Sequence, residues 1–224
     1  MKKRYFVIFY ILFSIILISC DEKQNGKTPK VPEIQEYNIS FVYDHIRPLR
    51  SQLQQNSNAD NVFDSGINSV DLLDLSSFSK SHFSDFASFK NQEYLSFFNK
   101  RKTQVISFFG NIDEISIELV QKHHFSDSAG IIHMTDIPNF TTTNGIALEM
   151  AKDDVKKILG EPIYRFKERG HEVLYYQISD LAPNLKSQIL AEYEDKIRFV
   201  NIYTGIYIFK NNRLIEMSFG FPSP

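Results

Sequence analysis

Two segments one hundred residues apart constrain the fold most strongly, because each one reads as strand, tight turn and strand. They run from Ile106 to Leu119 and from Ile206 to Phe219. In the second segment Asn211-Asn212 suits the positive backbone angles of a two-residue hairpin turn. The residues that follow this turn alternate between apolar and polar types, as a half-buried strand does. We therefore predict two antiparallel hairpins.

The two segments also share residues at matching positions, which bears on how the chain is organised. The identical pairs are Ile106/Ile206, Phe109/Phe209, Asn111/Asn211 and Ile115/Ile215. Related halves produce such pairs, and so does chance, because strands favour few residue types. Our interpretation is an α+β fold of short helices packed on antiparallel sheets, in two tandem related helix-plus-sheet halves at 37–120 and 121–224.

A short helix with a sharp stop is predicted near the start of the second half. Within GIALEMAKDDVKKILGEP, an apolar stripe is formed at helical spacing by Val155, Ile158 and Leu159. Gly160 suits the left-handed conformation that ends a helix, and Pro162 prevents its continuation. We expect two strands to follow, at 163–168 and 173–178, joined by a turn at Gly170.

This pattern resembles the BamE/SmpA-type domain of small envelope lipoproteins, and a wider class that includes the beta-lactamase-inhibitor fold. The matching residues are Val155, Leu159, Gly160 and Pro162 at the helix end and Tyr175-Tyr176 in an aromatic strand. Ala151 stands where the family has a capping Ser or Thr, and 179–199 reads as an inserted amphipathic helix starting near Pro183. The resemblance implies a non-catalytic role in outer-membrane assembly.

Between residue 37 and the first hairpin the sequence is harder to interpret. The polar stretch 51–61 reads as a loop. From Val62 to Phe98 the apolar residues are mostly three or four positions apart, which predicts one or two short helices with serine-rich polar faces. We interpret their aromatic residues as core.

The N-terminus has the layout of an export signal. Met1–Arg4 carries three positive charges, and the apolar run Tyr5–Ser19 is shorter than the ~20 residues that a membrane-spanning helix needs. Leu17-Ile18-Ser19-Cys20 resembles the lipobox of bacterial lipoproteins. The resemblance implies cleavage after Ser19 and a diacylglyceryl thioether on Cys20. The alternative is an uncleaved hydrophobic helix that ends in a free cysteine.

After residue 20 the sequence changes to a polar tether and an acidic body. Residues 20–36 hold the cysteine and a segment with two prolines and almost no apolar residues, and such a segment spans roughly 20–25 Å on average. Removal of residues 1–19 takes three bases from the chain and changes its formal charge from −2 to −5. We therefore expect no nucleic-acid partner, and we interpret Lys100-Arg101-Lys102 as a solvated turn. Cys20 is the one cysteine in the sequence, so no disulfide is expected.

Candidate catalytic and metal-binding residues are few. Ser77 and Lys80 fit the S-x-x-K spacing of serine acyltransferases, but the companion motifs are missing from the sequence. Zinc accepts the side-chain types that occur together at His123, His124, Asp127, His133 and Asp136. Their spacing matches no known ligand pattern, so we favour a polar loop here and expect neither a metal nor a cofactor.

The sequence therefore predicts a lipoprotein of the bacterial cell envelope, with the outer membrane favoured, held by lipidated Cys20 and facing the periplasm or the cell surface. Its partner is expected to be an envelope protein, and Tyr175, Tyr176 and Tyr203 are the candidates for an exposed aromatic contact face. One alternative is a surface-displayed binding or inhibitory module for an external protein or small ligand. A second alternative is an enzyme, which the missing motifs disfavour.

Overall fold

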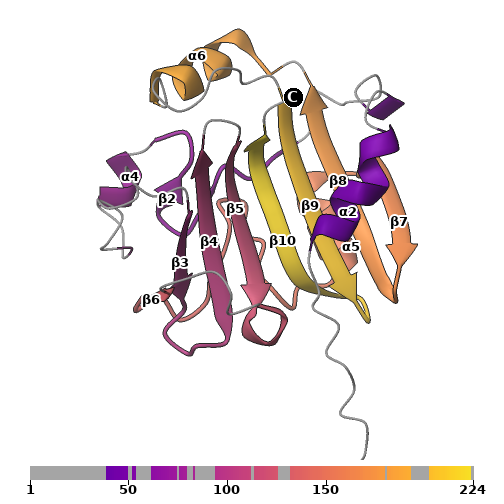
Figure 1. Ribbon diagram of the computed structural model, residues 1–224, viewed down its shortest axis with the longest axis horizontal. Helices are drawn as coiled ribbons and strands as arrows, with labels where there is room; N and C mark the ends of the chain where they lie inside the picture. Colours follow the sequence, from indigo (N-terminus) through magenta and orange to yellow (C-terminus); the bar gives the residue numbers. More distant parts are fainter. Residues whose placement is uncertain are drawn as a thin grey trace, which may run out of the picture. The chain divides into compact units, whose positions relative to one another are not determined.

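Most of the described secondary structure lies in a single large β-sheet, seen in the computed structural model of the chain (Figure 1). The structure describes residues 39–49, 52–53, 62–74, 76–79, 83, 94–111, 114–125, 132–179, 181–192 and 202–222. All of these residues belong to one compact unit, Glu36–Pro224. The predicted signal and tether lie outside the described residues.

The large sheet has eight strands in the order β6-β3-β4-β5-β10-β9-β8-β7. Their bounds are β3 (Tyr94–Phe98), β4 (Gln104–Asn111), β5 (Glu114–Gln121), β6 (Ile132–Met134), β7 (Tyr164–Glu168), β8 (His171–Ser179), β9 (Ile202–Lys210) and β10 (Arg213–Pro222). Neighbouring strands are antiparallel, except that β3 and β6 are parallel. A separate two-stranded sheet joins β1 (Gly66–Ile67) to β2 (Val70–Asp71).

The described helices are short. They are α2 (Ser40–Ile46), η1 (Arg47–Leu49), α4 (Ser76–Ser79), η3 (Lys122–His124), α5 (Lys152–Leu159) and α6 (Pro183–Glu192). Short helices combined with a sheet that is mostly antiparallel agree with the predicted α+β class. No helix in the described ranges combines the length and the apolar character that crossing a membrane requires.

Both predicted hairpins are confirmed. β4 pairs with β5 and β9 pairs with β10, each across a two-residue turn. In the second hairpin Asn211 and Asn212 have φ angles of 51° and 62°, as a primed turn requires. The second strands of the two hairpins, β5 and β10, pair with each other at the centre of the sheet.

A β-bulge shifts the two hairpins out of the register that their identical residues suggested. The bulge lies between Leu214 and Glu216, and an extra residue at a bulge reverses the alternation of faces beyond it. Ile106 and Ile206 consequently pack in different clusters on opposite faces of the sheet, although the sequence aligns them. The identical pairs are therefore not structurally equivalent, whereas the hairpins are.

The two faces of the sheet carry different cores. The back face holds a large apolar cluster that includes Leu95 of β3, Leu119 of β5 and Tyr207 of β9, and α5 packs there through Val155 and Leu159. The front face holds a smaller cluster, in which Phe41, Val42 and Ile46 of α2 pack on strands β8 to β10. Figure 1 shows α2 in front of the sheet and α5 behind it.

The α5 region agrees with its prediction. α5 ends at Leu159, and Gly160 follows with a φ of 83°. Ala151 precedes the helix without a side-chain capping bond. Arg169 and Gly170 have positive φ angles in the turn between β7 and β8, and α6 begins at Pro183 as expected.

The helical prediction for 62–98 is wrong for most of the described part of this segment, and the four-residue helix α4 is the exception. Tyr94–Phe98 is strand β3, with Leu95 and Phe97 buried in the back cluster. The residues of β3 alternate between the two faces of the sheet. The helix was predicted because the aromatic residues of this segment are also three or four positions apart. The first part of the segment forms the β1–β2 hairpin, and α4 is a single turn.

Of the predicted loop at 51–61, residues 52–53 are helical, and the others lie outside the described residues.

Candidate functional site

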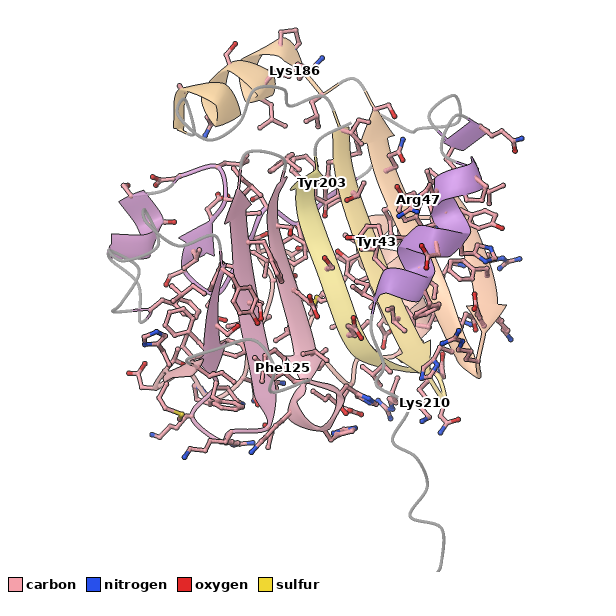
Figure 2. The ribbon with its side chains drawn as sticks, in the orientation of Figure 1. Tyr43, Arg47, Phe125, Lys186, Tyr203 and Lys210 are labelled. Carbon is pink, nitrogen blue, oxygen red and sulfur yellow. The ribbon has the colours of Figure 1, made fainter. Side chains whose placement is uncertain are left out.

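Exposed basic side chains gather at one end of the large sheet, and we call this group the basic rim. Its members are Lys100, Arg101, Lys102, Lys122 and Lys210, all of which are exposed. The first three follow β3, Lys122 follows β5, and Lys210 ends β9. Figure 2 shows Lys210 at this end and Lys186 of α6 at the opposite end.

Strand pairing brings these distant residues to the same end. Gln104 opens β4 and pairs with Gln121, which closes β5. The Lys122 backbone N–H donates to the Thr103 carbonyl at 2.9 Å, which ties the end of β5 to the β3–β4 turn. β5 and β10 are antiparallel neighbours, so the β9–β10 turn that begins at Lys210 lies at this end as well.

The rim charges are not neutralised by ion pairs within the described part of the chain. The nearby acids Glu168 and Glu172 are paired with other groups, at 3.7 Å from Arg169 and 3.0 Å from Lys152 respectively. Glu149 accepts a hydrogen bond from Gln121. The ammonium group of Lys122 lies 5.3 Å from the centre of the Phe98 ring, which is a cation–π contact.

The histidines beside the rim are affected by its positive charge. The pKa of His124 is lowered to about 4, mainly by burial and then by the charges of His123, Lys210 and His171. The pKa of His171 is lowered by burial and by Lys210. At neutral pH these two rings are therefore uncharged, and the rim charge comes from lysine and arginine.

The histidines and aspartates considered as candidate zinc ligands do not form one cluster among the described residues. His123 and His124 lie in η3 with ring centres 4.1 Å apart, whereas His133 lies in β6 at the edge of the sheet. Asp127 lies outside the described residues. Within the described ranges, no group of three or more His, Cys, Asp or Glu residues could hold a metal ion.

The three tyrosines expected to form an exposed contact face are buried. Tyr175, Tyr176 and Tyr203 are 5%, 3% and 1% exposed, so in this structure they form no such face. Tyr175 packs in the front cluster, whereas Tyr176 and Tyr203 pack in the back cluster. The sequence could have excluded a common face for Tyr175 and Tyr176, because adjacent strand residues point to opposite faces.

Tyr203 instead belongs to a buried polar network around Asp64, which the sequence analysis missed. The Tyr207 hydroxyl donates to Asp64 Oδ2 at 2.9 Å, and Asn144 Nδ2 donates to Asp64 Oδ1 at 2.9 Å. The Asp64 backbone N–H donates to the Tyr203 hydroxyl at 3.2 Å. Burial raises the pKa of both tyrosines, so they remain protonated. The network therefore holds the segment before β1 against the sheet.

Ser77 of the S-x-x-K spacing is also used structurally. Its hydroxyl donates to the Asp74 carbonyl at 2.5 Å and accepts from the Asp71 backbone N–H at 2.9 Å. Lys80 lies outside the described residues. These bonds hold the turn that leads into α4, which gives Ser77 a role that needs no catalysis.

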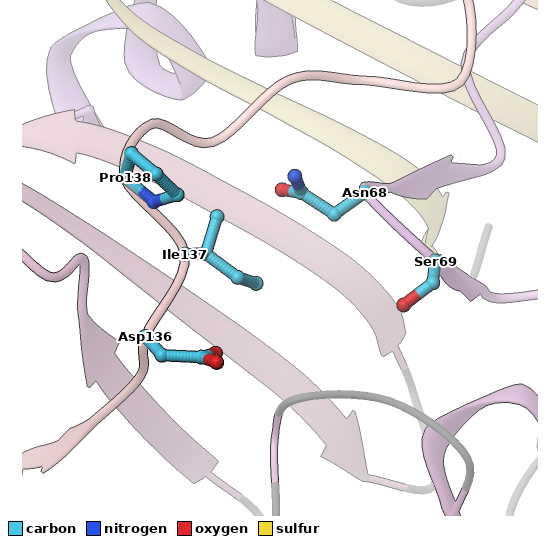
Figure 3. Close-up of a pocket in the computed structure, with 5 residues that line it drawn as sticks. All are labelled: Asn68, Ser69, Asp136, Ile137 and Pro138. Atoms are coloured by element: carbon cyan, nitrogen blue, oxygen red, sulfur yellow. The ribbon is translucent and has the colours of Figure 1, made fainter.

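A shallow depression lies between the β1–β2 turn and the segment after β6 (Figure 3). Its volume is about 480 Å³, and its lining is formed by Asn68, Ser69, Asp136, Ile137 and Pro138. Asp136 is the single ionisable residue in this lining. The basic rim gathers five exposed charged side chains, so it is the stronger candidate for recognition.

Comparison of the chain with models of protein families, with curated proteins and with solved structures finds no match. The resemblance to the BamE/SmpA-type domain therefore stays a prediction from the residues that carry it.

Proposed function

We propose that the chain is a lipid-anchored protein of the bacterial envelope that binds another envelope protein without catalysing a reaction. The observation that carries this proposal is Leu17-Ile18-Ser19-Cys20 directly after an apolar run and before a polar tether. Two or three acyl chains on Cys20 would hold the protein at a membrane essentially permanently. The outer membrane is the favoured location, with the body facing the periplasm or the cell surface.

The use of polar groups in the body favours binding over catalysis. The Asp64 carboxyl group is engaged by Tyr207 and Asn144, and Ser77 is engaged by the backbone of its own turn. Five exposed basic side chains instead come together in the basic rim, from turns that are far apart in the sequence. A charged surface on a rigid sheet suits recognition and orientation of a partner.

The proposal extends to the organisation of the fold as two tandem related halves, 37–120 and 121–224. The strand order supports it, because β3-β4-β5 on one side of the centre is matched by β8-β9-β10 on the other. The β5–β10 pair is antiparallel, which is the pairing that two halves related by a twofold axis perpendicular to the sheet would have. The halves share the back core, and we therefore propose them as parts of one domain. On the BamE/SmpA-type analogy, the domain supports outer-membrane assembly.

The mass of the native N-terminal peptide tests the anchor. We expect the mature protein to begin at Cys20 with a diacylglyceryl group on its sulfur, and a Cys20→Ala variant to keep residues 1–19. A mature protein that begins elsewhere, or that carries an unmodified sulfur, would contradict the proposal.

Crosslinking in living cells tests the partner. A photoreactive residue placed at Tyr43, Lys186 or Lys210 samples three separate surfaces (Figure 2). We expect one position to capture a specific envelope protein and the other two to capture much less. Capture of lipid alone from all three positions would exclude a protein partner. Protease treatment of intact cells then separates the alternatives, because digestion indicates surface display and protection indicates a periplasmic role.

A further inference from the structure

We propose that the basic rim rests on the acidic phospholipid headgroups of the membrane that holds the anchor. This inference depends on the proposed lipidation of Cys20, and it assigns a specific surface to the contact. The rim is built from turn tips at one end of the sheet, and its five basic side chains are exposed and have no ion pair among the described residues. Such an arrangement can meet a flat anionic surface without any movement of the sheet.

The direction of α2 agrees with this orientation. α2 is the first described helix, and it begins at Ser40, about twenty residues after Cys20. Figure 2 shows Tyr43 of α2 closer to Lys210 than Arg47 is, so the N-terminal end of this helix is the end nearer to the rim. The tether that the sequence predicts reaches roughly 25 Å, which lets the rim approach the membrane at high effective concentration.

The chemistry of the rim favours headgroups over an acidic protein. Four of its five members are lysines, and lysine is depleted in the desolvated centres of protein interfaces, where Tyr, Trp and Arg are enriched. Lysine is a flexible point charge that suits mobile phosphates. Burial, then the charge of His123 and then that of Lys210 in the rim lower the pKa of His124.

The acids at this end do not cancel the rim. Glu168 and Glu172 are held by Arg169 and Lys152. Glu149 is hydrogen-bonded to the neutral side chain of Gln121, and Asp136 lines the depression of Figure 3, so these two acids offset at most two of the five rim charges. Near an anionic membrane each additional Lys or Arg strengthens binding by about fivefold, so several rim residues acting together give a measurable contact.

Vesicle binding by the unlipidated mature chain isolates this contact. Residues 20–224 with Cys20→Ser contain every described core residue, and circular dichroism checks the fold. The rim variant is Lys100→Glu/Arg101→Glu/Lys102→Glu. The control is Arg47→Glu/Lys157→Glu/Lys186→Glu, which makes the same change in net charge away from the rim. The probes are phosphatidylcholine vesicles with and without 30% phosphatidylglycerol, in low salt.

We expect the parent chain to bind the phosphatidylglycerol vesicles at least about 30-fold more tightly than pure phosphatidylcholine vesicles. The rim variant should lose about 30-fold or more of this binding, and the control less than threefold. Equal losses in the two variants, or no preference for phosphatidylglycerol, would overturn the inference. If the rim variant binds vesicles as the parent chain does, but a photoreactive residue at Lys210 of that variant no longer captures a protein in cells, the rim would be assigned to a protein instead. An unmodified Cys20 in the native protein would refute the lipid anchor. The vesicle experiment would still test the rim, because it uses the unlipidated chain.

Discussion

On its back face the sheet carries one apolar cluster from β3 to β8, whereas on its front face the apolar cluster is confined to β7–β10 and the strands from β3 to β10 also carry buried polar side chains. Ser96, Ser107, Glu118 and Ser218 form a row across four neighbouring strands of the front face. Within this row Ser96 and Ser107 share a hydrogen bond of 2.8 Å. The same strands therefore serve two environments, and the back face is the one whose apolar cluster runs without a break from β3 to β8.

The largest effect is expected where β5 and β10 pair at the centre of the sheet, and we call this contact the β5–β10 seam. A Cβ atom added at Gly220 would lie 2.2 Å from the Ile115 carbonyl oxygen and 2.5 Å from the Ser116 Cα atom, so the strands would have to separate. We expect Gly220→Ala to lower the free energy of unfolding by about 3–5 kcal/mol.

Gly205→Ala is the matched control for Gly220→Ala. The nearest atom to an added Cβ at Gly205 is Tyr207 Cε2 at 3.1 Å, which belongs to a side chain that can move. We expect a change of about 1 kcal/mol or less. Urea denaturation measures both variants, and equal losses would show that the seam is no tighter than the β9 interior.

A pair of Tyr→Phe substitutions compares hydrogen bonds on the two faces. Tyr207→Phe removes the bond to Asp64 on the back face and should cost about 2 kcal/mol, because the acceptor is a buried carboxyl group. Tyr175→Phe removes the 2.8 Å bond to Gln177 on the front face and should cost about 1 kcal/mol. Thermal or urea unfolding measures both variants. A larger loss of stability for Tyr175→Phe would show that the front-face hydrogen bond stabilises the fold more than the back-face one does.

The hairpins were predictable because alternation and turn chemistry are local properties of the sequence. The bulge at Leu214–Glu216 was not, because one extra residue changes which face a side chain meets without changing the alternation nearby. β3 was missed because closely spaced aromatic residues fit both a helix and a strand. Lys100-Arg101-Lys102 was interpreted alone as a solvated turn, and its relation to Lys122 and Lys210 depends on strand order, which a single sequence does not specify.

The buried carboxyl group of Glu216, on the front face, should make the stability of the fold depend on pH. Glu216 is 2% exposed and its Oε2 has no hydrogen-bond partner among the described residues. Burial, and then the charge of Glu118, raises the pKa of Glu216 well above its usual value. As pH rises above ~4.3 the unfolded chain releases this proton first, so the group's contribution to stability falls until the native pKa is reached.

We therefore expect Glu216→Gln to remove part of the loss of stability between pH 4 and pH 8. Relative to the parent chain, the variant should gain about 1–2 kcal/mol over this range. Glu118→Gln should give a smaller gain, because it removes the neighbouring charge but leaves the buried carboxyl group. Urea unfolding at several pH values measures both, and parallel curves for the parent and Glu216→Gln would show that Glu216 is ionised without cost.

The smallest expected effect is at α2, the layer that covers the apolar part of the front face. The His45 ring stacks on Phe166 with centres 4.0 Å apart, and its Nδ1 lies 3.5 Å from Glu168 Oε2. A helix of seven residues is unstable alone, so these contacts help to hold it on the sheet. We expect His45→Ala to cost about 1 kcal/mol, and Arg47→Ala, whose ion pair with Asp44 is exposed, to cost almost nothing. Hydrogen exchange locates the change: faster exchange confined to α2 means that it opens as a separate layer, whereas faster exchange in β9 as well means that the front and back cores unfold together.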